Sequence, residues 1–417
     1  MNLLKTSYWS LLSTGIKLLS GLIINEAVSV FYGPSGLAVI GQLQNLISIS
    51  QTVSSCGAYS GITKYTSEYS EDKKKLQNFF LSCSALLVSM SFLTGIILIL
   101  FSENISKYLF NSEEYHFVVI FLGFSIPLFT LNQFLLSVIN GLRETRVYFK
   151  LNIFQSIYGV IYTATLIYLF ELNGALIAIS TNQAVIFFNA LYWFVKINRI
   201  KIELSKLKLE SSFFKKMFNY SIMSLVAACC YPLVFISLRG YIEERSSWEA
   251  VGAWQAMLYI STLYLMVIST VLNTYFLPVF SKIKDNNILR NELYNGLKVI
   301  VPSVVLMSCV IYFSKYYIVS LLFTSEFSLM LPLFKWQLVG DIFKIISYIF
   351  IYFIIAKTMV KEYILVELIG SFFYWCMSMF LFDKFGLIGM SYAHAINYLI
   401  CLIVVSTIVI RRVKLQC

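Results

Sequence analysis

Charge is what this 417-residue sequence has least of. Only 13% of its residues are charged, whereas 59% are hydrophobic and the mean hydropathy is +0.77. A soluble domain carries about a quarter charged residues, which cover its surface in water. The apolar residues fall in blocks of about 20, the length of helix that crosses about 30 Å of hydrocarbon, and they lack the alternation of barrel strands. The composition therefore predicts an all-α integral membrane protein.

Groups for catalysis and metal binding are also scarce. The chain has two histidines, His116 and His394, and its eight cysteines form no Cys/His cluster, so no zinc site is expected. We find no paired acidic motif of a glycosyltransferase, no Walker lysine loop and no Ser-His-Asp arrangement that two histidines could serve. These absences favour a transporter over an enzyme, and no cofactor is expected.

Twelve apolar blocks are long enough to cross a membrane. The pattern predicts spans at 3–31, 36–62, 77–101, 116–140, 150–170, 174–195, 216–238, 251–276, 295–313, 331–356, 362–382 and 387–410. The first block contains Lys17 and Glu26 and precedes no small-residue cleavage site, so it is interpreted as a retained helix rather than a signal peptide. A basic stretch at 199–215 divides the chain into predicted six-helix lobes, residues 1–198 and 216–417, a familiar plan of transporters.

Positive charge predicts the orientation of these spans. Of the 32 Lys and Arg residues, 24 fall on the side that holds the N-terminus and every second loop, and five fall on the other side. Cytoplasmic loops carry the excess of Lys and Arg, so both termini are expected in the cytoplasm. Anionic lipid headgroups suffice as partners for the net charge of +11, and no nucleic-acid partner is expected.

Three ionisable residues in the predicted spans each fit two interpretations. An ionisable group in hydrocarbon costs about 2.5–3.5 kcal/mol on insertion scales, which demands a partner or a function. Lys17 lies roughly 15–20 Å deep, too far to reach the headgroups comfortably, which favours a role in a cavity. Glu26 fits an interfacial carboxylate or a coupling site, and Arg239 fits an interfacial anchor or a contact to an anion.

Four more ionisable residues lie in the last three spans. Asp341 and Lys344 are three residues apart and therefore share a helix face. They fit a self-neutralising pair, or a switchable pair in which protonation of Asp341 frees Lys344 for an anion. Glu367 and His394 fit interhelical hydrogen-bond partners or proton carriers.

Several short strings resemble the bacterial Wzx flippases, which move undecaprenyl-pyrophosphate-linked oligosaccharides. They are FYGPSGL at 31–37, GITKY at 61–65, VGAWQ at 251–255, Leu277-Pro278, and WQLVGD at 336–341 with Lys344 beyond it. The likeness is collinear from residue 1 to about residue 410. It implies the fold of the multidrug/oligosaccharidyl-lipid/polysaccharide exporter superfamily, with two six-helix lobes facing a central cavity.

The resemblance also implies functional residues. Related flippases carry the same residue type at Lys17, Lys64, Arg143, Arg239, Asp341, Lys344 and Glu367. The cations among them are candidate contacts for the pyrophosphate or glycan, since a pyrophosphate in a low-dielectric cavity needs cations. Asp341, Glu367, Glu26 and His394 are candidates for coupling or gating. The common antigen flippase has a lysine in place of Glu26, so a shared cation is not expected there.

The sequence thus predicts a flippase for undecaprenyl-pyrophosphate-linked O-antigen or related repeat units, working by alternating access. Candidate coupling ions are H⁺ and Na⁺. Candidate protein partners are the O-antigen polymerase and the chain-length regulator. One alternative function is that of a multidrug-type cation antiporter, which would need acidic residues in the walls of its cavity. Rivals of another class are a polytopic polymerase and an acyltransferase. The polymerase should have a long periplasmic loop, and the acyltransferase an intramembrane histidine, for which His394 is weak support.

Overall fold

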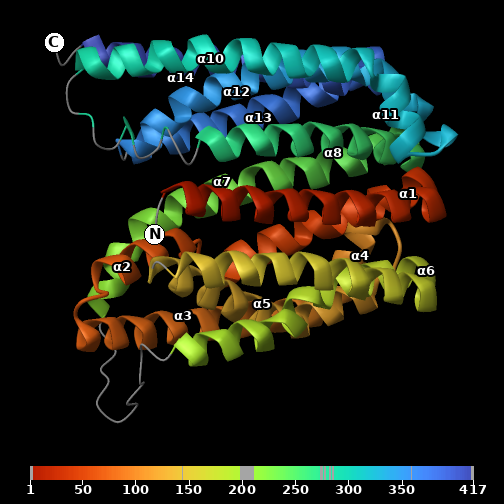
Figure 1. Ribbon diagram of the computed structural model, residues 1–417. Coiled ribbons are helices and arrows are strands. Elements are labelled where there is room, and N and C mark those ends of the chain that lie inside the picture. The colour runs from red at the N-terminus through yellow and green to blue at the C-terminus, as the bar shows by residue number, and fades with distance from the viewer. Residues whose placement is uncertain are drawn as a thin grey trace. The chain divides into compact units, whose positions relative to one another are not determined.

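The computed structural model describes residues 3–142, 144–197, 211–272, 276, 279–280, 283, 286–357 and 359–414, and these residues are overwhelmingly helical (Figure 1). The helices of the first half are α1 (Leu3–Ser54), α2 (Tyr59–Glu68), α3 (Lys73–Leu100), α4 (Ser102–Phe110), α5 (His116–Gly141) and α6 (Thr145–Ile197). The second half comprises α7 (Ser211–Arg245), α8 (Trp248–Val271), α10 (Asn286–Phe313), α11 (Lys315–Leu322), the 3₁₀ segment η3 (Ser325–Leu333), α12 (Phe334–Ala356), α13 (Val360–Phe385) and α14 (Ile388–Lys414).

The contacts divide the chain into two compact units. Unit 1 comprises Met1–Val28 and Val39–Pro232, and unit 2 comprises Ser29–Ala38 and Leu233–Cys417. The boundary within α7 falls at Pro232, a residue that removes a backbone donor from the helix. Most of the predicted linker, residues 199–210, lies outside the described residues, so the predicted lobe boundary there stays a prediction.

Two helices are long enough to cross a membrane twice. The apolar part of α1, Leu12–Ser54, has 43 residues and that of α6, Thr145–Lys196, has 52, against the about 20 that one crossing needs. Each breaks at a non-helical residue, Gly33 in α1 and Glu171 in α6. These breaks fall where the sequence predicts the turns between spans one and two and between spans five and six.

Within the described residues, nine helices are long and apolar enough to be membrane spans. Counting α1 and α6 twice, because each breaks in its middle, and adding α7 accounts for the twelve predicted spans. The prediction of an all-α membrane protein with about twelve transmembrane helices is confirmed.

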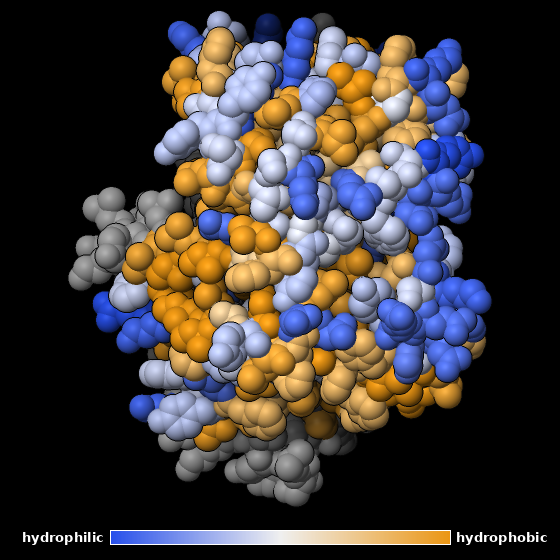
Figure 2. Space-filling model, turned by 90° about the vertical axis from the view of Figure 1, so that its right-hand side faces the viewer, coloured by the Kyte–Doolittle hydropathy of each residue, from blue (hydrophilic) through white to orange (hydrophobic). Residues whose placement is uncertain are grey.

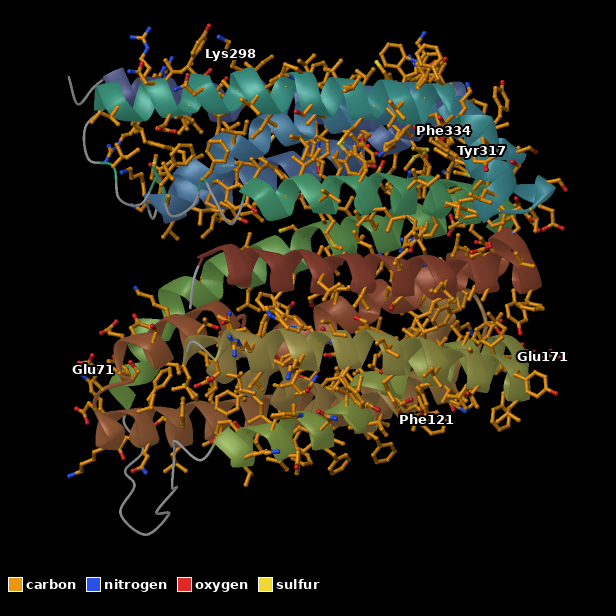
Figure 3. The ribbon with its side chains drawn as sticks, viewed as in Figure 1. Glu71, Phe121, Glu171, Lys298, Tyr317 and Phe334 are labelled. Atoms are coloured by element: carbon orange, nitrogen blue, oxygen red, sulfur yellow. The ribbon has the colours of Figure 1, made fainter. Side chains whose placement is uncertain are left out.

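The surface of the helices suits lipid along their length. Phe313 is 82% exposed and Tyr168 88% exposed, and the face drawn in Figure 2 carries large hydrophobic areas with hydrophilic side chains gathered along one edge. Within unit 1, Glu71 and Glu171 lie at opposite ends of the helices, whereas Phe121 lies along their length (Figure 3). Charged ends and apolar flanks are the pattern of a bundle that spans a bilayer.

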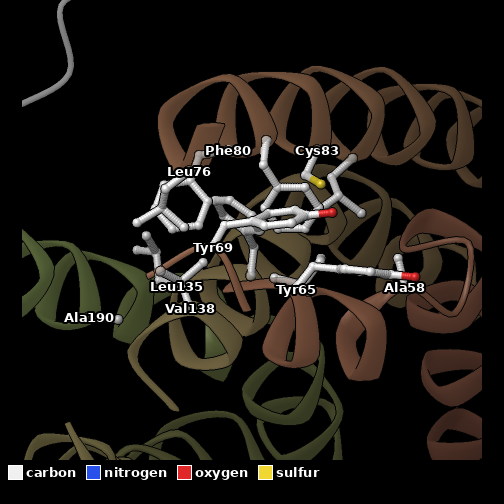
Figure 4. Close-up of a cluster of buried hydrophobic side chains, with 13 residues drawn as sticks. Ala58, Tyr65, Tyr69, Leu76, Phe80, Cys83, Leu135, Val138 and Ala190 are labelled. Carbon is white, nitrogen blue, oxygen red and sulfur yellow. The ribbon is translucent and has the colours of Figure 1, made fainter. Parts of the chain in front are cut away.

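An aromatic cluster forms part of the core of unit 1 (Figure 4). Tyr65 and Tyr69, one turn apart on and just after α2, stack with ring centroids 5.8 Å apart, and both meet the ring of Phe79 on α3 edge-on. The Asp72 side chain caps the N-terminus of α3 by accepting a hydrogen bond from the Lys75 amide. The short helix α2 is thereby fixed against α3 and α5.

In unit 2, α12 packs against α8, α10, α13 and α14. The corner of α1, Ser29–Ala38, belongs to this unit. The Ser29 hydroxyl donates to the Leu322 carbonyl at 3.1 Å, and a Cβ at Gly252 would overlap the Pro34 carbonyl. No pattern in the sequence predicts that this corner packs with the second half of the chain.

Corresponding turns in the two halves share one backbone shape. Glu171 has φ 55° and ψ −135°, and Gly386 has φ 63° and ψ −148°. Three residues after each comes a glycine, Gly174 or Gly389. A Cβ on either would overlap a carbonyl oxygen eight residues earlier, that of Leu166 or Leu381 respectively. Such a likeness is what a duplicated six-helix unit would leave in the two halves of the chain.

Glu171 has a positive φ in a sparsely populated backbone region, which costs an L-residue about 1–3 kcal/mol. We expect Glu171→Gly to raise the unfolding midpoint, because the relieved strain exceeds the entropy cost of glycine, about 0.5–1 kcal/mol. Gly386→Ala should lower the midpoint through the backbone alone, because nothing lies within 4 Å of its added Cβ. Tryptophan fluorescence during thermal unfolding in detergent measures both. Shifts of the same sign would contradict the backbone argument.

Candidate functional site

A buried carboxylate, that of Asp341 on α12, lies at the centre of the polar network in unit 2. Its side chain is fully buried. One carboxylate oxygen accepts hydrogen bonds from the hydroxyls of Ser261 at 2.6 Å and Tyr264 at 2.7 Å, both on α8. The other oxygen lies 2.9 Å from Nε2 of His394 on α14. Asp341 therefore joins three helices through short polar contacts, of the kind that offsets the cost of burying an anion.

Gly340 makes room for this arrangement. A Cβ there would overlap the imidazole of His394 and lie 3.0 Å from the Ala395 backbone, so only glycine lets α12 and α14 approach this closely. The ring of His394 packs between those of Tyr374 and Tyr398, with centroids 6.4 and 4.8 Å away. The imidazole is thus held in place while its Nε2 faces the carboxylate.

Lys344 lies one turn beyond Asp341 and is partly buried. Its ammonium lies 5.0 Å from the ring centroid of Tyr398 and 5.9 Å from that of Tyr348. The ion-pair partner of Asp341 in the described residues is His394, when protonated. Lys344 instead sits over aromatic faces, which attract a cation without neutralising it. Its positive charge is available to an anion.

Glu367 on α13 adds a second carboxylate beside this group. It is partly buried, shares a hydrogen bond with Tyr363 and interacts electrostatically with Lys344. Lys344 therefore lies within the electrostatic reach of both Glu367 and Asp341. The carboxylate pair can change the field at the lysine by taking up or releasing a proton.

Arg239 on α7 is buried in unit 2, with 3% of its surface exposed. Its guanidinium donates to the side-chain oxygen of Gln255 on α8 and interacts electrostatically with Tyr374. Because the ring of Tyr374 also packs against His394, this tyrosine lies between the arginine and the Asp341 network. The sequence placed Arg239 at the outer end of a span, and the structure encloses its side chain.

The remaining predicted site residues belong to the first half of the chain. Lys17 and Glu26 on α1 are exposed. Lys64 on α2 is exposed too and lines a cavity of about 630 Å³ with Thr63, Ser67, Glu68, Asn140 and Gly141. Arg143 lies outside the described residues. The roles of these four residues stay predictions.

The sequence interpretation missed the residues that satisfy Asp341. Ser261 and Tyr264 are spaced by three on one helix and so share a face, which marks a polar face on an otherwise apolar span. That pattern could have identified α8 as a neighbour of some buried polar group. It could not have named Asp341, which lies 80 residues from Ser261.

We expect Gly340→Ala to displace His394 and lower the free energy of unfolding by about 1–3 kcal/mol, because overpacking forces side chains and backbone to shift. Gly240→Ala on α7 is the matched control, since nothing lies within 4 Å of its added Cβ. Alanine favours a helix over glycine by about 1 kcal/mol, so the control should be neutral or stabilising. Equal thermal midpoints for the two variants would contradict the close packing of α12 on α14.

Solved structures share this architecture. An inward-facing multidrug resistance MATE family transporter of the MOP superfamily matches with a TM-score of 0.82 at 13% identity, over 95% of this chain and 94% of that one. An outward-facing MATE family transporter matches with a TM-score of 0.74 at 14% identity, over 99% and 95%. Identities this low show the fold alone, which is that of MOP-superfamily transporters.

Curated relatives match nearly end to end. The Lipid III flippases of Escherichia coli (strain K12) and Shigella flexneri are each 26% identical over 400 residues, 96% of this chain and 96% of theirs. The family model described as polysaccharide biosynthesis protein matches residues 3–284. With well over half of its length matched, this chain belongs to the polysaccharide biosynthesis protein family.

Proposed function

We propose that this protein is a flippase that carries undecaprenyl-pyrophosphate-linked oligosaccharides from the cytoplasmic to the periplasmic leaflet by alternating access. The single observation that carries the proposal is the set of buried and half-buried charges in unit 2, with Lys344 held over aromatic rings beside two carboxylates. Such a site suits a charged headgroup, and it lies in a chain similar over nearly its whole length to flippases of a lipid-linked substrate.

The positive groups favour an anionic headgroup. Lys344 is our first candidate for the pyrophosphate, with Arg239 close to the same network. Lys17, Lys64 and Arg143 are the candidates from unit 1. A multidrug-type cation antiporter would instead need a carboxylate free to meet a cationic substrate. The Asp341 oxygens already accept from two hydroxyls and an imidazole, which counts against that rival.

A proton is the coupling ion that we favour over Na⁺. A Na⁺ ion needs oxygen ligands with lone pairs to offer, whereas the Asp341 oxygens face donors. Protonation of Asp341 would end its ion pair with His394 and strengthen the net positive field at Lys344, which lies within range of both. Capture and release of the pyrophosphate could then follow the protonation state of this network.

The membrane setting completes the proposal. We place the protein in the bacterial inner membrane with both termini in the cytoplasm, as the distribution of Lys and Arg predicts. The polyprenyl tail would stay in lipid during transport. The O-antigen polymerase and the chain-length regulator are the proposed protein partners, and O-antigen is the surface polymer that we favour.

Deletion of the gene should trap complete lipid-linked repeat units on the cytoplasmic face and abolish the surface polymer. An impermeant sugar-oxidising reagent, applied to spheroplasts with radiolabelled lipid-linked glycans, reports which leaflet holds them. Single units that reach the periplasmic face without forming long chains would point to a polymerase and contradict the flippase.

Asp341→Asn together with Glu367→Gln should abolish transport, because amides cannot bind and release the coupling proton. Complementation of the deletion, scored by surface polymer and by repeat units on the periplasmic face, measures it. Glu113→Gln serves as the control, since Glu113 is an exposed carboxylate paired with Lys107. Intact transport by the double variant would eliminate proton coupling through these carboxylates.

A further inference from the structure

Three long segments of unit 1 carry polar side chains without any charge. Residues 39–63, 117–142 and 172–195 contain no charged residue, yet amides and hydroxyls recur along them. In unit 2, by contrast, the network holds Asp341, Lys344, Glu367, Arg239 and His394. Uncharged amides in a membrane span demand an explanation of their own, because a buried amide without partners is costly.

Three glutamines from three helices meet in unit 1. The side-chain oxygen of Gln183 on α6 accepts a hydrogen bond from the amide nitrogen of Gln51 on α1 at 3.2 Å and from that of Gln133 on α5 at 3.4 Å. Both are longer than the usual distance of about 2.9 Å. The three amides are therefore held together by weak bonds that a ligand could replace at little cost.

A hydroxyl pair extends this group along the same two helices. Ser54 and Thr130 lie one turn from Gln51 and Gln133 respectively, and their hydroxyl oxygens are 2.7 Å apart. The Tyr59 hydroxyl reaches the Thr130 carbonyl at 3.5 Å. Together with the three glutamines, Ser54 and Thr130 form a continuous uncharged polar seam, which we call the amide seam.

Much of the hydrogen-bonding capacity of the amide seam is unused. Among the described residues, no hydrogen bond engages the amide nitrogen of Gln183 or the side-chain oxygens of Gln51 and Gln133. Next to Gln133, the side chain of Asn132 is fully buried with neither of its amide atoms bonded in this part of the chain. The seam therefore offers both hydrogen-bond donors and hydrogen-bond acceptors to a ligand.

We propose that the amide seam is the subsite for the glycan of the lipid-linked substrate, an inference that rests on the proposed function. A sugar hydroxyl both donates and accepts, as a carboxamide does, so the two match without any charge. The pyrophosphate is excluded from this seam, because its three segments carry no cation to pair with it. The seam therefore recognises the glycan, and the pyrophosphate needs cations that lie elsewhere in the chain.

The test compares the binding of two lipids to the purified protein in nanodiscs. One is undecaprenyl pyrophosphate, and the other is the lipid-linked oligosaccharide extracted from cells deleted for this gene. The wild type should bind the glycan-bearing lipid at least tenfold more tightly. Gln183→Met keeps the side-chain length and removes the amide. It should lower the affinity for the glycan-bearing lipid about tenfold and leave the affinity for undecaprenyl pyrophosphate unchanged. Lys344→Met should lower the affinity for both lipids.

Asn152→Leu is the matched control, since the Asn152 amide bonds the Tyr148 carbonyl of its own helix at 2.9 Å, and it should change neither affinity. If Gln183→Met does not fold, Gln51→Met and Gln133→Met replace it. The glycan subsite would be overturned if these variants lowered the affinity for both lipids equally, or if they changed neither affinity. The amide seam would then be only a contact between helices. Failure of the wild type to bind either lipid would overturn the proposed function itself.

Discussion

The buried carboxylate of Asp341 is the group on which the arrangement of unit 2 depends. A bilayer offers no water to a buried anion, so its donors must come from other helices. Ser261 and Tyr264 supply them from α8 and His394 from α14, and Gly340 permits the close approach that the imidazole needs. Lys344 and Glu367 lie within the field of this network. Protonation of Asp341 therefore changes the contacts among three helices and the electrostatic field at Lys344.

The proposed substrate, a lipid-linked oligosaccharide, needs two kinds of chemistry. Its pyrophosphate is an anion that needs positive charge, and its glycan is a set of neutral hydroxyls that needs amides and hydroxyls. Ionisable groups gather inside unit 2, while the amide seam of unit 1 is uncharged.

The sequence predicted the fold well, because the length and hydrophobicity of a span depend only on local composition. Even the corners at Gly33 and Glu171 fall where turn residues interrupt apolar blocks. The candidate site was predicted less completely. Helical spacing placed Asp341 and Lys344 on one face. The partner His394, however, is 53 residues from Asp341, and sequence periodicity does not show which helices will be in contact. For the same reason the packing of Ser29–Ala38 in unit 2 and the meeting of Gln51, Gln133 and Gln183 were not foreseen.

Transport by the purified protein tests the flippase most directly. Proteoliposomes that carry the lipid-linked oligosaccharide in both leaflets are treated with an impermeant sugar-oxidising reagent. We expect protein-containing vesicles to lose glycan from both leaflets, whereas protein-free vesicles should lose only the outer-leaflet share. Oxidation limited to the outer leaflet in both, with the protein folded and correctly inserted, would contradict the claim that this chain moves the lipid across the membrane.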